Sequence, residues 1–222
     1  MRKIMVAAFV SLDGVMQAPG GPEEDPTGGF EHGGWVAGYP DDVVGAAMGE
    51  LLSKPYELLL GRKTYDIFAA HWPHITDPNA PDFAIAEAFN RVTKHVATHR
   101  PESLAWNNSR TLGPDPVAKL RELKKEEGLA LLTQGSSDFL QTLFANDLVD
   151  ELRLLVYPIV LGRGKRLFGS SAKPAGFRLE SSQVSPNGII VAAYTRAGDV
   201  KTGSFALEEP TPEEIARRND LR

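Results

Sequence analysis

Residues 129–168 read LALLTQGSSDFLQTLFANDLVDELRLLVYPIVLGRGKRLF. The stretch holds a short apolar run that stops at a glycine, an amphipathic helical pattern, a second apolar run and a second glycine loop. A strand that ends on a glycine turn and opens directly into a helix points unpaired backbone N–H groups and the positive helix end at one place. Nucleotide phosphates bind at such places. The stretch therefore predicts an enzyme domain that binds a nucleotide.

The same joint of strand, glycine and helix occurs upstream. Residues 56–60 predict a buried strand, Gly61 ends it, and a helical pattern begins at Arg62. Further strands are expected at residues 4–10, 94–98, 152–157 and 188–196, and further helices at residues 43–52, 80–92 and 116–127. Continuous apolar strands that alternate with helices indicate an α/β fold with a mostly parallel central sheet. The last two strands have no helix between them, so the sheet is expected to be mixed there.

Composition limits the partners of the chain. Its 222 residues with 42% hydrophobic content favour one domain with a substantial core. A net charge of −5 gives no basic excess, so no nucleic acid and no membrane partner is expected, and a small molecule is. The absence of cysteine excludes thiolate metal sites and disulfides and fits a reducing compartment. The apolar start is too short for an export signal, so a cytoplasmic protein is expected.

A glycine- and proline-rich segment follows the first strand. Residues 14–40 contain eight glycines and four prolines, a density that excludes a helix or a central strand. Loops of this length inside a domain are usually lids or binding loops. Phe30, Trp35 and His32 argue against disorder, because disordered segments are poor in such side chains. We expect an ordered lid over a site.

The last residues form an extension to the domain. Residues 1–196 are expected to make the domain and residues 197–222 a C-terminal extension, with an edge strand at residues 200–207. Thr211 and Glu214 then have the spacing of a capping box at the start of a polar helix. That helix is expected to pack weakly or to contact another subunit.

Four motifs in order resemble the dihydrofolate-reductase-like family. They are SLDG at 11–14, LGRKTY at 60–65, QGS at 134–136, and VDEL at 149–152 leading to PIVLGRGKRLF at 158–168. The sequence is most similar to stand-alone relatives of the reductase domain of the bifunctional riboflavin-biosynthesis deaminase–reductase, over about residues 3–196. The resemblance implies a mixed eight-stranded sheet flanked by helices, a homodimer, and hydride transfer from NADPH to a heterocycle or a ribosylamine.

The resemblance also implies which residues bind NADPH. They are Gly61, Arg62, Lys63 and Thr64 at the phosphates and adenosine ribose, Thr98, His99 and Arg100 around the 2′-phosphate, and Gly135, Ser136 and Ser137 at the pyrophosphate turn. Glycine permits close approach to phosphate, and the arginine fork matches phosphate oxygens, which favours NADPH over NADH. The family usually carries a double glycine where this chain has Gly135-Ser136. Taken singly, Gly135 also suits a plain turn, Ser137 a plain N-cap, and Lys63 a solvated helix start.

The catalytic and substrate residues have two interpretations each. Asp13 either supplies a proton near the nicotinamide or caps its own turn. Phe30, His32 and Trp35 either stack on a flat substrate or pin the lid by packing. The substrate-phosphate candidates of the second glycine loop, which equally fit a solvated hairpin or a subunit contact, are Arg163, Lys165 and Arg166.

The sequence thus predicts an NADPH-dependent reductase of a small heterocyclic substrate. The leading reaction is reduction of the 5-amino-6-(5-phosphoribosylamino)uracil type in riboflavin biosynthesis. The alternatives are reduction of dihydrofolate or another pterin, and a nonenzymatic nucleotide-binding or dimerisation module. The HWPH segment at residues 71–74 has no clustered carboxylates and is interpreted as a surface loop packed by Trp72, so no metal site is expected.

Overall fold

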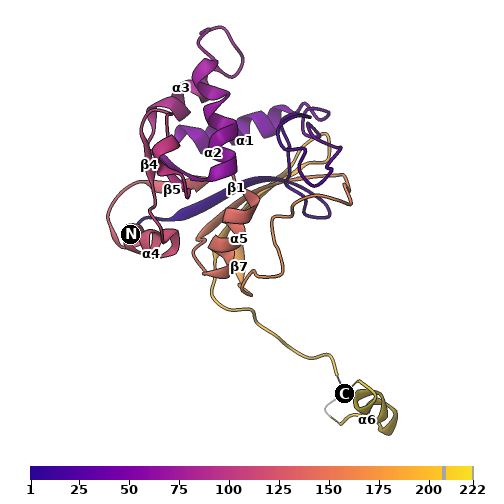
Figure 1. Cartoon of the computed structure of the whole chain (residues 1–222). Helices are drawn as coiled ribbons and strands as arrows, with labels where there is room; N and C mark the ends of the chain where they lie inside the picture. Colours follow the sequence, from indigo (N-terminus) through magenta and orange to yellow (C-terminus); the bar gives the residue numbers. More distant parts are fainter. Residues whose placement is uncertain (207–208, 222) are drawn as a thin grey trace.

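The computed structural model describes residues 1–206 and 209–221. Strands and helices alternate along most of the chain (Figure 1). In order, the elements are β1 (Ile4–Ser11), α1 (Asp42–Ser53), β2 (Tyr56–Gly61), α2 (Arg62–Ala69), η1 (Trp72–His74), α3 (Phe83–Arg91), β3 (Lys94–Ala97), η2 (Pro101–Ser103), β4 (Ser109–Thr111), α4 (Pro116–Lys125), β5 (Ala130–Thr133), α5 (Ser137–Ala145), β6 (Glu151–Tyr157), β7 (Phe177–Val184), β8 (Ile190–Arg196) and α6 (Pro212–Asn219).

The strands form one eight-stranded sheet in the order β4-β3-β2-β5-β1-β6-β8-β7. The pairs from β4 to β6 are parallel, and β8 pairs antiparallel with both β6 and β7. The prediction of a mostly parallel α/β sheet that becomes mixed at its end is confirmed. Helical crossovers connect the parallel strands, whereas β7 and β8 follow each other directly.

Strand β1 is buried on both faces, which explains its continuous apolar sequence. Ile4 and Val6, and the residues at every second position after them in β1, face α4 and α5. Ala7 faces the side of α1, α2 and α3. Figure 1 shows these two groups of helices on opposite sides of the sheet. Phe9, one step further along β1, packs with the segment that follows the strand. The central sheet is therefore the middle of three layers.

The predicted edge strand at residues 200–207 is wrong for its described part. Residues 200–206 form no strand, and residue 207 lies outside the described residues. The edge strand at this end of the sheet is β7, whose residues are exposed along nearly its whole length and which bulges between Leu179 and Ser181. Backbone pairing with β8 holds β7 in place, so its sequence lacks the apolar alternation that marks a half-buried strand. The short, exposed β4 carries no such pattern either.

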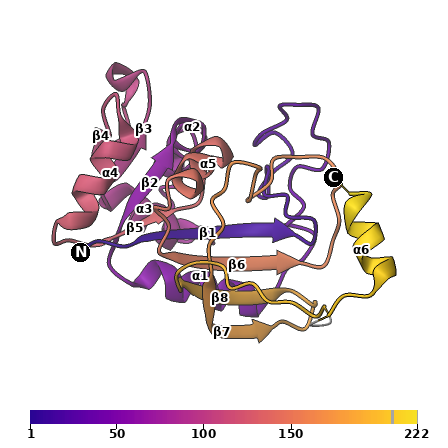
Figure 2. The same ribbon diagram turned by 90° about the horizontal axis from the view of Figure 1, so that it is seen from below.

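The segment of residues 14–40 and the C-terminal extension lie at the periphery. Figure 2 shows residues 14–40 beyond the carboxyl end of β1. Helix α6 lies apart from the sheet (Figure 1), and Thr211 Oγ1 accepts a hydrogen bond from Glu214 N at 3.3 Å, as half of the predicted capping box requires. Glu214 itself pairs with Arg217 and Arg218. None of the described helices combines the length and apolar character needed to cross a membrane.

A network of hydrogen-bonded polar side chains lies at the end of the sheet opposite the lid. Glu57 of β2 pairs with Arg2 and accepts a hydrogen bond from His95 Nε2 at 2.7 Å. Burial lowers the pKa of His95, against the opposing effect of the Glu57 carboxylate. Burial would raise the pKa of Glu57, but the hydrogen bonds from His95 and Arg2 outweigh it and lower the value.

This network makes stability depend on pH. The unfolded His95 takes up a proton below its ordinary pKa of 6.5, whereas the folded side chain resists doing so. The free energy of unfolding is therefore expected to fall between about pH 7 and about pH 5 and to fall further as Glu57 is protonated. Urea midpoints across this range measure it. The variant His95→Gln keeps a donor for Glu57 and should lose the part of the pH dependence that lies between about pH 7 and about pH 5. An unchanged pH dependence of the free energy of unfolding in that variant would contradict the assignment.

Candidate functional site

Two strand–helix joints meet at the carboxyl end of the sheet. Gly61 at the end of β2 donates its N–H to Gly135 O at 3.1 Å, so the β2–α2 and β5–α5 turns touch. A Cβ on Gly61 would lie 2.8 Å from Phe139 Cβ and 2.9 Å from Ser136 N, and one on Gly135 would lie 2.6 Å from Thr64 Oγ1. The contacts with backbone and Cβ atoms favour glycine at position 61, and the positive φ of 148° favours it at position 135. The Gly135–Ser136 peptide bond is cis.

The joints present two helix N-termini side by side. Gly61 is the N-cap of α2 and Ser136 is the N-cap of α5, and neither helix has a side-chain cap hydrogen bond. Ser137 is the first residue of α5, one position beyond the N-cap position considered for it. The first-turn N–H groups of both helices are thus left free at the carboxyl end of the sheet, and the hydroxyl of Thr64 lies close to Gly135. This arrangement suits an anion with two phosphate groups.

A cationic cluster lies beside the first joint. Arg62 donates to Thr98 Oγ1 at 3.2 Å, to Ser103 Oγ at 2.6 Å and to Asp66 at 2.8 Å. Arg100 lies 3.7 Å from Asp66. The predicted residues that follow β2 and β3 are therefore brought together, with Ser103 and Asp66 added by the structure. His99, between Thr98 and Arg100, is exposed.

Asp25 fastens the lid to the joints. Its carboxylate accepts from Lys63 Nζ at 2.6 Å and from Lys165 Nζ at 2.8 Å, and Thr27 Oγ1 accepts from the same two lysines. The Asp25 side chain is 8% exposed. Burial opposes its charge, but hydrogen bonds from Lys165, Lys63 and Thr27 outweigh burial and hold its pKa far below the ordinary range. Lys63 is consequently ion-paired rather than simply solvated.

Asp13 binds a neighbouring loop. Its carboxylate accepts from Ser11 Oγ at 2.6 Å and from the N–H groups of Leu161 and Gly162 at 3.1 and 2.9 Å. The hydrogen bonds from Ser11 and from the N–H groups of Leu161 and Gly162 lower the pKa of Asp13. Burial acts in the opposite direction and is outweighed. Asp13 is not among the residues that line the main cavity. The geometry favours a structural role over proton supply, but the backbone groups that Asp13 caps belong to the loop of Leu161 and Gly162 rather than to its own turn.

The three cationic side chains of residues 163–166 lie in different surroundings. Arg166 donates to Asp13 O and to Gly162 O at 3.3 Å and lies 3.5 Å from the Asp13 carboxylate, so it joins its own loop to the turn after β1. Arg163 is exposed and, like Arg166, lies outside the lining of the main cavity. Lys165 alone lines that cavity, through its pair with Asp25.

The lid aromatics pack beneath the lid. Trp35 Nε1 donates to Gln17 O at 2.8 Å, and the Trp35 ring meets Tyr157 edge-on at 5.3 Å. Phe30 is buried, with its ring edge-on to the exposed His32 at 5.9 Å. None of the three candidates lines the main cavity. The packing interpretation therefore fits Phe30 and Trp35.

The main cavity has a volume of about 730 Å³ and lies between the lid, the joints and the helices α1 to α3. Five of the predicted cofactor residues line it: Lys63, Thr64, Gly135, Ser136 and Ser137. Lid residues 16–21 and 23–25 line the opposite side. Among them, burial raises the pKa of Glu24, although the N–H groups of Gly20 and Gly21 donate to its carboxylate.

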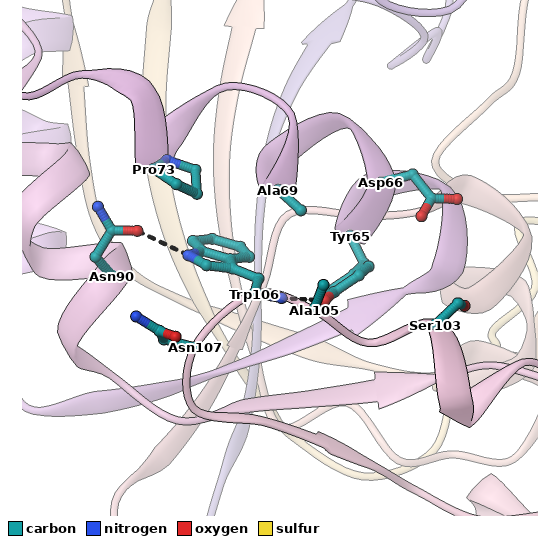
Figure 3. A pocket seen from close by; sticks show the side chains of 9 residues that line it. All are labelled: Tyr65, Asp66, Ala69, Pro73, Asn90, Ser103, Ala105, Trp106 and Asn107. Atoms are coloured by element: carbon teal, nitrogen blue, oxygen red, sulfur yellow. Dashed lines mark hydrogen bonds between the residues drawn. The ribbon is translucent and has the colours of Figure 1, made fainter.

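A second, more open cavity of about 510 Å³ lies on the outer side of α2 (Figure 3). Its polar groups are satisfied within the protein: Trp106 N donates to Tyr65 Oη at 2.9 Å and Trp106 Nε1 to Asn90 Oδ1 at 2.7 Å. Lys94, behind Trp106, is fully buried and donates to two backbone carbonyls. This region stabilises the β3–β4 connection.

The sequence interpretation missed several cavity residues. Asp25 lies in the predicted lid, but nothing in its surroundings marks it as the partner of Lys63 and Lys165. His71 and Trp72 line the main cavity, in addition to the packing predicted for Trp72. Among the residues that the structure describes, no group of three or more His, Asp or Glu side chains is arranged to hold a metal ion.

Residues 2–191 match the model of the RibD C-terminal domain. The chain belongs to this family. The resemblance identified from the four motifs is thereby confirmed. The protein YyaP of Bacillus subtilis (strain 168) is 23% identical over 193 residues, which cover 87% of this chain and 94% of that protein.

Solved structures share the fold of this RibD C-terminal domain. A protein from Shewanella sp. PV-4 that is named for riboflavin biosynthesis superposes with a TM-score of 0.63 at 20% identity, covering 88% of this chain and 99% of that one. Dihydrofolate reductase from Enterococcus faecalis, solved with NADP(H), gives 0.54 at 15% identity, covering 87% and 96%. A pyrimidine reductase-like protein from Corynebacterium diphtheriae gives 0.51 at 14% identity, covering 89% and 93%.

The close contact between the two joints predicts how a methyl group added at Gly61 changes the free energy of unfolding. Gly61→Ala is expected to lower the free energy of unfolding by about 1–3 kcal/mol, because the new Cβ meets backbone and Cβ atoms that cannot turn aside. Gly45→Ala is the matched control, since that helical position is open and alanine there should stabilise by about 0.5–1 kcal/mol. Urea unfolding measures both. Equal effects of the two variants would contradict the close contact.

Proposed function

We propose that this protein is an NADPH-dependent reductase of a small heterocyclic substrate. The observation that carries the proposal is the contact between Gly61 and Gly135, which sets two uncapped helix N-termini beside one cavity. Membership of the RibD C-terminal domain family and the fold shared with a dihydrofolate reductase solved with NADP(H) support it.

The residues present fit the cofactor. The glycines let the two joints approach each other beside the cavity, and Thr64, Ser136 and Ser137 add hydroxyl donors at the cavity wall. Arg62 and Arg100 set two positive charges against the single carboxylate of Asp66, which leaves an excess for a 2′-phosphate. When bound, NADPH supplies a hydride. The protein's part is to hold the phosphates, exclude water with the lid and provide a proton.

Glu24 is our candidate proton donor in place of Asp13. It lines the cavity from the lid, and burial favours its protonated form, whereas the hydrogen bonds of Asp13 favour the anion. The leading substrate is the 5-amino-6-(5-phosphoribosylamino)uracil type that the family name suggests. Dihydrofolate is the alternative, supported by the shared fold alone.

A binding titration followed by a substrate panel tests the proposal. NADPH is expected to bind with a change in nicotinamide fluorescence below about 1 mM, the upper end of ordinary Michaelis constants. NADPH oxidation is then expected with the ribosylaminouracil phosphate, with dihydrofolate as the comparison. Turnover of dihydrofolate alone would indicate a pterin reductase, and binding without any turnover a nonenzymatic module. Absence of NADPH binding would overturn the proposal.

Cofactor choice is tested at Arg100. Arg100→Ala should weaken NADPH binding by about tenfold, as loss of a charge-assisted contact to phosphate does, and leave NADH binding unchanged. Arg178→Ala, which removes an exposed arginine of the edge strand, is the control and should change neither. Equal losses for both cofactors in Arg100→Ala would show that Arg100 does not read the 2′-phosphate. Fluorescence titrations with each cofactor give the ratio.

A further inference from the structure

A short flap within the lid lies at one side of the main cavity. The flap is defined here as residues 22–27, which Gly20 and Gly21 precede and Gly28 and Gly29 follow. The last two glycines have φ of 74° and 69°, in the left-handed region that favours glycine. Paired glycines give the backbone on each side of the flap more conformational freedom than other residues would.

The flap is attached to the rest of the domain mainly by polar groups. Of its six residues, all of them in the described part of the chain, only Asp25 is buried. The other five are half-buried or exposed. The lid beyond the flap is held differently, because Phe30 and Trp35 are buried in an apolar cluster. The flap can therefore be released while the base of the lid stays packed.

The Asp25 carboxylate supplies the charged part of this attachment. Lys63 Nζ and Lys165 Nζ donate to it at 2.6 and 2.8 Å, and both also donate to Thr27 Oγ1. Gln17 Nε2 adds hydrogen bonds to the backbone oxygens of Asp25 and Thr27, both at 2.9 Å. Lys63 belongs to α2 and Lys165 to the loop between β6 and β7. One carboxylate thus ties the flap to two separate elements.

The two lysines also face any anion that enters the cavity. Among the described residues that line the main cavity, Lys63 and Lys165 are the only lysines or arginines. Asp25 offers them one negative charge, whereas a phosphate group carries about 1.5–2 and has three strong acceptor oxygens. Such an anion would compete with Asp25 for the same ammonium groups. A buried carboxylate without its cations is costly, so the loss of these pairs favours movement of Asp25 into water.

We propose that Asp25 is an anion-sensitive latch, which holds the flap at the cavity until a phosphate-bearing anion takes Lys63 and Lys165 from it. Because the flap and the anion compete for the same two cations, each weakens the binding of the other. The proposal goes beyond the proposed reductase function. It depends on charge alone and applies to any molecule that presents a phosphate group to this cavity.

Limited digestion with a glutamate-specific protease measures release of the flap. Cleavage after Glu23 or Glu24 reports on the flap, and cleavage after the exposed Glu127 is the internal control, with fragments separated by mass. Lys165→Gln removes one cation and leaves the cleaved sequence unchanged, so flap cleavage should rise about tenfold. Lys173→Gln, at an exposed lysine of the same loop, is the matched control and should leave it unchanged. An unchanged rate in Lys165→Gln would overturn the latch.

Inorganic pyrophosphate tests the competition on the wild-type protein, in case a variant does not fold. It should raise flap cleavage relative to cleavage after Glu127, and the effect should saturate. Sodium chloride at equal ionic strength should raise it less, because largely buried ion pairs are weakly screened. No increase, or an equal increase with chloride, would overturn the proposal.

Affinity for pyrophosphate gives the reciprocal measurement. Asp25→Asn removes the competing charge, so calorimetry should show pyrophosphate binding about tenfold more tightly than to the wild-type protein. Weaker or equal binding by Asp25→Asn would contradict the competition. The NADPH titration described above is a separate result: absence of NADPH binding would refute the reductase and leave the latch standing, whereas a flap that does not respond to pyrophosphate would refute the latch alone.

Discussion

The contact between Gly61 and Gly135 is the constraint on which the site depends. Strands β2 and β5 are neighbours in the sheet, so the turns that follow them compete for the same space. Without a side chain at either position, the two turns approach to hydrogen-bond distance and α2 and α5 begin side by side. Their positive ends then act on one point rather than on two.

Asp25 makes the lid part of this electrostatic arrangement. Lys63 begins α2 and Lys165 lies in the loop before β7, and one buried carboxylate joins both to the lid. Within this cluster, two cations and one carboxylate leave a single net positive charge. An anion at the joints therefore meets a weaker field than a count of lysines implies, and most of its attraction must come from the helix N-termini.

The fold was predictable wherever the sequence signals lie close together in the chain. The site was predictable only in part. Glycine between an apolar run and a helical pattern marked both joints, because those signals lie within a few residues of each other. Asp25 was not predictable, since its partners are 38 and 140 positions away in the chain. Trp72 posed a different problem: the sequence indicates a packed ring, but only the three-dimensional contacts show that its N–H has no acceptor.

The position of Asp13 shows why proximity in sequence is a poor guide to a proton donor. It follows β1 directly, at the sheet edge where the joints lie, yet its oxygens are engaged by Ser11 and by the N–H groups of Leu161 and Gly162. Such donors stabilise the anion, and a carboxylate held as the anion cannot release a proton near neutral pH. A donor needs the opposite environment, a carboxyl removed from water beside the ligand. Burial raises the pKa of Glu24, a lid residue that lines the main cavity, so its environment favours the protonated form more than that of Asp13 does, even though Gly20 and Gly21 donate to its carboxylate.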